Sequence, residues 1–153
     1  MELLIFFLGV LTAILGYIFS NFFLKPISQY KDINAKIGYK LTYYVHIITS
    51  PGKGMLADEA RPVIRDLACD LERRYLSIPL RHLVEFLRLV PTEDDIIAAK
   101  GQLIFISNSL NNSGRTDENH IALGKIFELL KIKELKNGSM VEAGKLYGKN
   151  REE

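Results

Sequence analysis

The feature that most restricts the fold of this chain is an apolar run near its N-terminus, Leu3–Leu24. Thr12 is the only polar residue of the run before Ser20, and the apolar pattern resumes after Asn21. As a helix the run would be roughly 33 Å long, at about 1.5 Å per residue, which is enough to cross the hydrocarbon core of a bilayer. Residues 1–25 are therefore predicted to form a transmembrane anchor.

A cleaved signal peptide is the main alternative for such a run. Signal peptides have a positively charged start, a shorter apolar core and a cleavage site made of small residues. Here Glu2 carries the only charged side chain before the run, and no site of the A-x-A type follows it. The sequence therefore favours an uncleaved anchor.

The charges that follow the run predict its direction in the membrane. Lys25, Lys31, Lys36 and Lys40 lie on its C-terminal side, where Asp32 is the only acidic residue nearby. Positively charged residues next to a span stay on the cytoplasmic side of the membrane. We expect the N-terminus to lie outside and the remaining chain to be cytoplasmic.

Small residues follow one face of the predicted span. Gly9, Ala13, Gly16 and Ser20 recur at intervals of four, three and four residues, which places them in one stripe on a helix. Small residues let two helices approach closely in lipid, so the stripe indicates a homo-oligomer formed through the span. The alternative is that Gly and Ala are simply common in membrane helices.

The remaining chain has the size and charge of one small domain. Glu2 is the only one of the 18 acidic residues within the first 24 positions, so 20 basic side chains face 17 acidic ones in the rest. This small excess suits a position beside an anionic lipid leaflet and is too weak to indicate nucleic acid. The single cysteine, Cys69, excludes an intrachain disulfide.

Apolar residues at intervals of three and four predict an all-α domain over residues 26–132, a bundle of about five helices. The first helix is expected over about 26–49, with Pro26 either in its first turn or at a kink in a helix continuous with the span. The second is expected over about 58–75, with Asp58 as N-cap. Residues 133–153, rich in glycine and charge, are expected to form a flexible tail.

Three further helices complete the predicted bundle. A short one follows Pro79, with Leu80, Leu83, Val84 and Leu87 facing inward. Thr92 is the expected N-cap of the next, which continues to about residue 110. The last starts at Thr116 or Asp117, with Ile121, Phe127 and Leu130 expected to be buried.

Two groups of side chains are candidates for ligand binding. Guanidinium groups match phosphate oxygens in geometry, so the arginines on the second and third helices could form a basic groove for a nucleotide or a lipid headgroup. The alternative is that they lie on an ordinary solvated helix face. These residues are Arg61, Arg65, Arg81 and Arg88. Polar residues around residue 112 lie between a helix end and a helix start, where a small anion could bind; a capped turn is the alternative. They include Asn108, Asn112 and Arg115.

The sequence predicts no catalytic, cofactor or metal site. His46, His82 and His120 are widely separated and lack the spacing of a metal site. Cys69 lies beside Ala68 and is expected to be buried rather than nucleophilic. The chain is therefore expected not to be an enzyme.

Three stretches carry a resemblance to a known group of proteins. Phe23–Ile27 (FLKPI) leads into a tyrosine-rich helix, and Arg65–Leu71 (RDLACDL) and Leu103–Leu110 (LIFISNSL) follow later. With these, residues 22–132 resemble small bacterial inner-membrane proteins that have one N-terminal transmembrane helix and a helical cytosolic domain. The resemblance implies this membrane and this architecture, and it assigns no active residue.

Together these features predict a single-pass inner-membrane protein whose cytosolic helices bind a partner or signal, as a homo-oligomer. The expected partners are the lipid bilayer, a second copy of the chain, and a cytosolic protein or a small anionic ligand. One alternative is a ligand-gated membrane effector, for example in antiviral defence, whose helical domain senses a nucleotide signal. Another is a membrane-tethered enzyme.

Overall fold

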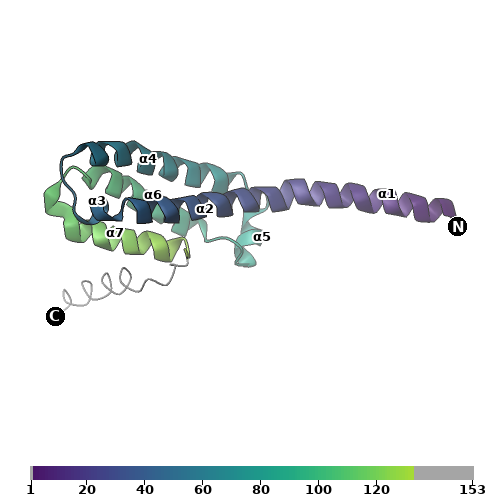
Figure 1. The fold of residues 1–153 in the computed structure, drawn as a ribbon. Helices are drawn as coiled ribbons and strands as arrows, with labels where there is room; N and C mark the ends of the chain where they lie inside the picture. Colours follow the sequence, from purple (N-terminus) through teal and green to yellow (C-terminus); the bar gives the residue numbers. More distant parts are fainter. Residues whose placement is uncertain (1, 133–153) are drawn as a thin grey trace.

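The computed structural model describes residues 2–132, which form helices connected by short loops and contain no strand. The predicted tail, residues 133–153, lies outside the described residues. A long helix projects from one end of a compact bundle (Figure 1). It consists of α1 (Glu2–Phe19), a π-helical turn (Ser20–Leu24) and α2 (Lys25–Tyr43). The fold is therefore all-helical, as predicted, with an apolar N-terminal helix that stands apart from the core.

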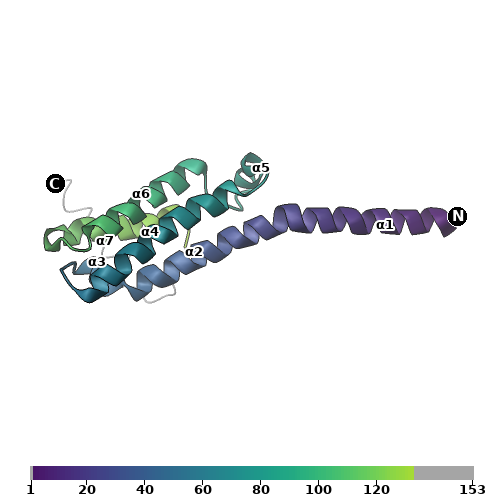
Figure 2. The ribbon, with the colours of Figure 1, turned by 90° about the horizontal axis from the view of Figure 1, so that it is seen from above.

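The π-helical turn shows how the chain accommodates Pro26. A proline has no N–H to donate to the carbonyl four residues earlier, and its ring crowds that carbonyl. Here the backbone widens just before the proline, and the Lys25 N–H donates to the carbonyl of Ser20, five residues back. Such a π turn inserts one residue without breaking the helix. The helix axis changes direction gently between α1 and α2 (Figure 2), so Pro26 bends a continuous helix rather than starting a new one.

Beyond α2 the chain runs up and down the bundle. The further helices are α3 (Val45–Thr49), α4 (Met55–Leu76), α5 (Arg81–Phe86), α6 (Glu93–Ser109) and α7 (Thr116–Leu129). α4 packs against α2 and α6, α7 packs against α6, and α3 lies against α7. The long helices α2, α4, α6 and α7 thus form a four-helix bundle, in which residues 77–92, including α5, connect α4 to α6.

The apolar face of the first predicted helix contributes a large part of the hydrophobic core. Its residues from Tyr30 to Ile48 are buried, as the spacing predicts: Tyr30, Ile33, Ile37, Leu41, Tyr44 and Ile48. The helix itself is broken at Tyr44, whose φ of −92° and ψ of 9° separate α2 from α3. The described residues beyond the apolar helix therefore form six α-helices instead of about five.

The N-caps of α4 and α6 differ in how well they were predicted. Thr92 caps α6 as expected: its hydroxyl accepts from the Asp95 N–H at 3.3 Å, and Asp95 accepts from the Thr92 N–H at 3.2 Å. The prediction for α4 is wrong, because this helix begins at Met55 and Asp58 lies within its first turn. Gly54 is the N-cap residue instead: its backbone is extended, with φ 176° and ψ 160°, and its carbonyl accepts from the N–H groups of Ala57 and Asp58 at 3.0 and 3.1 Å.

The inward face predicted for the third helix is also wrong. Only Val84 is buried, whereas Leu80, Leu83 and Leu87 are all exposed. α5 has six residues, and Leu80 before it adopts a left-handed φ of 48° that turns the segment away from the core. A helix this short buries one side chain and leaves its other apolar residues outside.

Tyr30 lies in the core with its hydroxyl unsatisfied. Its ring contacts the Tyr75 ring edge-on, at 6.3 Å between centroids, and the buried hydroxyl has no hydrogen-bond partner among the described residues. Burial, followed by the charge of Asp95, raises the pKa of Tyr30. The folded state therefore keeps this proton at a pH where the unfolded chain loses it.

Replacing Tyr30 with phenylalanine should increase stability. The change removes an unsatisfied hydroxyl, which is worth about 1 kcal/mol. The wild-type protein should lose stability above about pH 10, where unfolded tyrosine ionises, and Tyr30→Phe should lose less. Urea unfolding of the full chain in detergent, at neutral and alkaline pH, measures both effects. A variant that is less stable at neutral pH would show that the hydroxyl has a partner.

Candidate functional site

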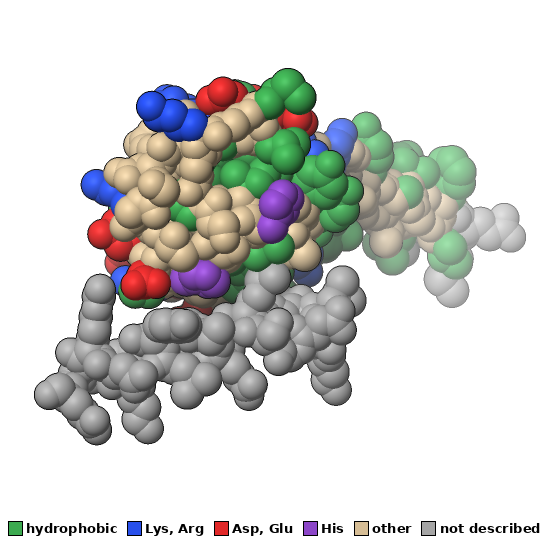
Figure 3. Space-filling view, turned by 60° about the vertical axis from the view of Figure 1, so that its left-hand side comes forward, with side chains coloured by type: hydrophobic (Ala, Val, Ile, Leu, Met, Phe, Trp, Pro, Cys, Tyr) green, Lys and Arg blue, Asp and Glu red, His purple; other side chains and the backbone are tan. Residues whose placement is uncertain are grey.

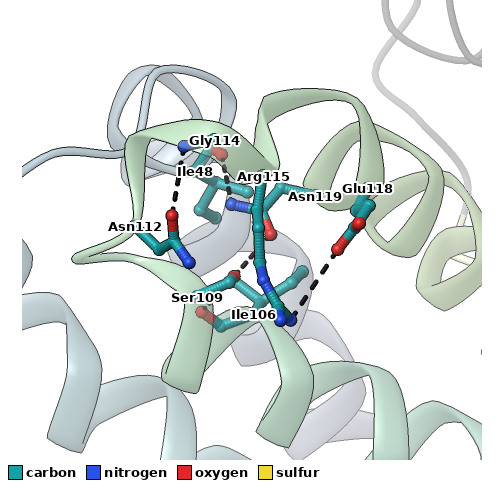
Figure 4. A network of polar contacts seen from close by, with 8 residues as sticks. All are labelled: Ile48, Ile106, Ser109, Asn112, Gly114, Arg115, Glu118 and Asn119. Carbon is teal, nitrogen blue, oxygen red and sulfur yellow. Dashed lines mark hydrogen bonds and ion pairs between the residues drawn. The ribbon is translucent and has the colours of Figure 1, made fainter.

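The polar cluster predicted between the last two helices forms a structured joint (Figure 4). Asn112 stands before a 3₁₀ turn, Ser113–Arg115, and its side-chain oxygen accepts from the Gly114 N–H at 3.2 Å. Arg115 lies 3.7 Å from the Glu118 carboxylate, and its guanidinium sits over the Phe105 ring at 5.6 Å. Asn112 caps a turn, and Arg115 already has an anionic and an aromatic neighbour.

Beneath this surface lies a buried hydrogen-bond network that the sequence analysis missed. Asn119 on α7 is fully buried and donates to the Ile48 carbonyl of α3 at 2.9 Å. The Ser109 hydroxyl of α6 donates toward the Asn119 side-chain oxygen and toward the Ile106 carbonyl. The network joins three helices at the end of the bundle, and its members satisfy one another rather than facing an open site (Figure 4).

The structure brings Arg65 and Asn108 together, although they belong to the two separate predicted groups. Arg65 on α4 donates to the Asn108 side-chain oxygen on α6. One turn earlier on α4, the Arg61 carbonyl accepts from the buried Ser107 hydroxyl at 2.9 Å. These contacts fasten α4 to α6, while the Arg61 side chain itself stays exposed.

Arg81 and Arg88 lie away from that pair, on the segment that contains α5. The Arg81 guanidinium stacks over the Tyr75 ring at 5.7 Å and lies 3.9 Å from the Glu93 carboxylate. Arg88 is exposed and ends α5 in a left-handed conformation, with φ 56°. Tyr75 is roughly 15 Å farther along α4 than Arg65, at about 1.5 Å per residue. The four arginines therefore do not line one groove.

On the face of the bundle shown in Figure 3, basic and acidic side chains lie interspersed over the surface instead of gathering into one basic area. Within residues 2–132, no three His, Cys, Asp or Glu side chains come together in a way that could hold a metal ion. Cys69 was expected to be buried and is exposed, because it lies on the outer side of α4 beside the buried Ala68.

Tyr75 forms a second polar contact that spacing did not reveal. Its hydroxyl donates to the Glu85 carboxylate of α5, and Arg81 covers its ring. Burial, followed by the bond to Glu85, raises the pKa of Tyr75. The contact holds α5 to the end of α4, so it is part of the fold rather than a binding group.

Comparison of the chain with protein-family models, with curated proteins and with solved structures found no match. The feature with the clearest functional meaning is the projecting helix. By length and composition, the helix that starts in α1 is long and apolar enough to cross a membrane, and none of its apolar stretch is buried in the bundle.

The predicted packing stripe also lies on this helix. Gly9, Ala13, Gly16 and Ser20 are all exposed, and a Cβ atom added to either glycine would meet nothing within 4 Å. Among the described residues the stripe thus has room for a partner helix.

Proposed function

We propose that this is a single-pass protein of the bacterial inner membrane whose cytosolic four-helix bundle binds a partner or signal. The observation that carries the proposal is the exposure of α1. Its large apolar side chains, such as Leu11 and Leu15, are more than half exposed, which is costly in water and favourable in lipid. The helix continues without a break into α2, and α2 places Tyr30 in the core, so the same helix joins the apolar segment to the bundle.

The proposed orientation places α1 across the membrane and the bundle in the cytoplasm. Lys25, Lys31 and Lys36 follow the apolar residues and are exposed, so they could contact anionic headgroups on the cytoplasmic side. A direct test uses alkaline phosphatase and a fluorescent protein, each fused to the C-terminus of the full chain. We expect a fluorescent, phosphatase-negative result, and phosphatase activity would contradict the orientation.

Self-association is proposed to run through the stripe of small residues. Two copies of α1 could approach closely at Gly9 and Gly16, where no side chain keeps them apart. Gly16→Leu should fill this space and weaken crosslinking between copies in membranes. Leu15→Ile, an exposed position beside the stripe, is the matched control and should leave crosslinking unchanged. Equal crosslinking in both variants would reject the stripe as the contact.

The bundle offers a surface for the proposed partner on α2. Tyr39 and Tyr43 lie one helical turn apart, 64% and 57% exposed, with their rings stacked at 6.3 Å. Lys40 lies within 6 Å of both ring centroids. Tyrosine is enriched at protein interfaces because it buries a large apolar ring and keeps a polar group in contact with water. Arg65 and Arg81 contact other side chains of the bundle, and the four predicted arginines do not line one groove, so no small-ligand function is proposed on them.

A further inference from the structure

The segment around α5 exposes an unusual number of large apolar side chains. Each is between 47% and 82% exposed, and we call this set the α5 apolar surface: Leu76, Leu80, Leu83, Phe86, Leu87 and Leu89. Ile78, Val84 and Val90 alternate with them along the chain and are buried. The segment is thus fixed to the core on one side and presents a leucine-rich face to its surroundings.

The α5 apolar surface lies at a particular end of the molecule. α5 occupies the end of the bundle from which α1 projects, next to the place where α1 passes into α2 (Figures 1 and 2). If α1 crosses a membrane and Lys25 marks its boundary, that end of the bundle faces the lipid headgroups. The exposed leucines then lie beside the bilayer and not in open cytoplasm.

We propose that the α5 apolar surface inserts into the headgroup region of the same membrane that α1 crosses. This inference rests on the proposed function, because only a membrane-spanning α1 keeps α5 at the lipid surface. Apolar residues combined with basic ones are typical of segments that lie in a membrane interface. Arg81 and Arg88 provide the basic side chains here, and Arg81 also neighbours Glu93.

The contacts of α5 suit an interfacial position. Tyr75 donates to Glu85 and lies beneath Arg81, so the acidic residue of α5 is turned toward the protein. Leu80 and Arg88 flank the helix with left-handed φ angles of 48° and 56°, a conformation that is costly for a leucine. The backbone of Leu80 is thus unfavourable, and its side chain is exposed. A lipid environment would stabilise the exposed leucine side chain.

Depth-dependent quenching in the full chain tests this inference. In a Cys69→Ser background, a single cysteine replaces Phe86, Met55 or Ile14 and carries an environment-sensitive dye. Phe86 and Met55 are matched, being 82% and 85% exposed, but Met55 starts α4 at the opposite end of the bundle. The proteins are reconstituted into vesicles of phosphatidylethanolamine and phosphatidylglycerol that contain lipids spin-labelled near the headgroup or deep in the acyl chain.

The α5 proposal predicts that the shallow quencher acts about threefold more strongly on the Phe86 label than on the Met55 label, as for side chains about 5–10 Å into the interface. The Ile14 label reports the span itself through the deep quencher. Quenching at Ile14 with equal, weak signals at Phe86 and Met55 would reject the α5 proposal and keep the span.

Two further results separate the proposals. Quenching at Phe86 without quenching at Ile14 would reject the span and overturn the α5 proposal, because α5 would then contact lipid without a membrane-spanning α1. No quenching at either site would also reject both. A blue shift at Phe86 that grows with protein density and is insensitive to lipid quenchers would show a second copy covering this surface, and would also overturn the proposal.

Discussion

Replacing Leu11 and Leu15 together with arginine is expected to remove the protein from the membrane fraction. Both side chains lie near the middle of the apolar run and are exposed, so neither contributes to the bundle core. An arginine at the centre of a span costs about 2.5–3.5 kcal/mol, and two should cost about 5–7 kcal/mol. Alkaline carbonate extraction of cells, followed by detection of the full chain, measures the loss.

The matched control places the same two arginines at exposed apolar positions outside α1. Met55 and Ile97 lie on α4 and α6 and are exposed, so Met55→Arg with Ile97→Arg adds an equal charge without touching the span. This variant should stay in the carbonate-resistant fraction. If the α1 variant also stays there, α1 is not what holds the chain in the membrane.

The helical faces of the bundle could be predicted because burial on a helix repeats every three to four residues. Ile96, Ala99, Leu103 and Ile106 follow this rule on α6 and are all buried. The break at Tyr44 could not be predicted in this way, since the apolar spacing continues through it. Spacing describes which side of a helix is buried and says little about small changes of direction between two helices.

The exposure of α5 shows a second limit of apolar patterns. Leu80, Leu83 and Leu87 have the spacing of a buried helix face, and a protein core and a lipid surface favour the same residues. The short length of α5 and the left-handed backbone of Leu80 decide that these leucines are exposed. The sequence shows a leucine-rich face, whereas the fold shows that this face is exposed and that α5 lies near the start of α2.

Contacts between distant residues were the least predictable part of the candidate site. Arg65 and Asn108 are 43 residues apart and meet only because α4 packs against α6. Asn119 is different, because the sequence contained a signal for its role. It occupies the same helix face as the buried Ala122, Leu123 and Ile126, and a polar residue in such a position needs a buried partner.

Replacing this asparagine with leucine should clearly destabilise the bundle. Asn119→Leu leaves the Ile48 carbonyl without its buried donor, while the single hydroxyl proton of Ser109 can then be donated only to the Ile106 carbonyl. An unsatisfied buried polar group costs about 1–3 kcal/mol, so we expect a loss of about 2–3 kcal/mol. Urea unfolding of the full chain in detergent, followed by circular dichroism, measures it.

Asn108→Leu is the control. Asn108 is exposed, and among the described residues its side chain bonds only to the exposed Arg65, so this substitution should change stability by no more than about 0.5 kcal/mol.

Ser109→Ala combined with Asn119→Leu completes a double-mutant cycle. The second change should cost less once the first is made, since both remove the same hydrogen bond and their coupling is expected at about 1 kcal/mol. Fully additive losses would mean that Ser109 and Asn119 stabilise the joint independently, each through its own backbone carbonyl.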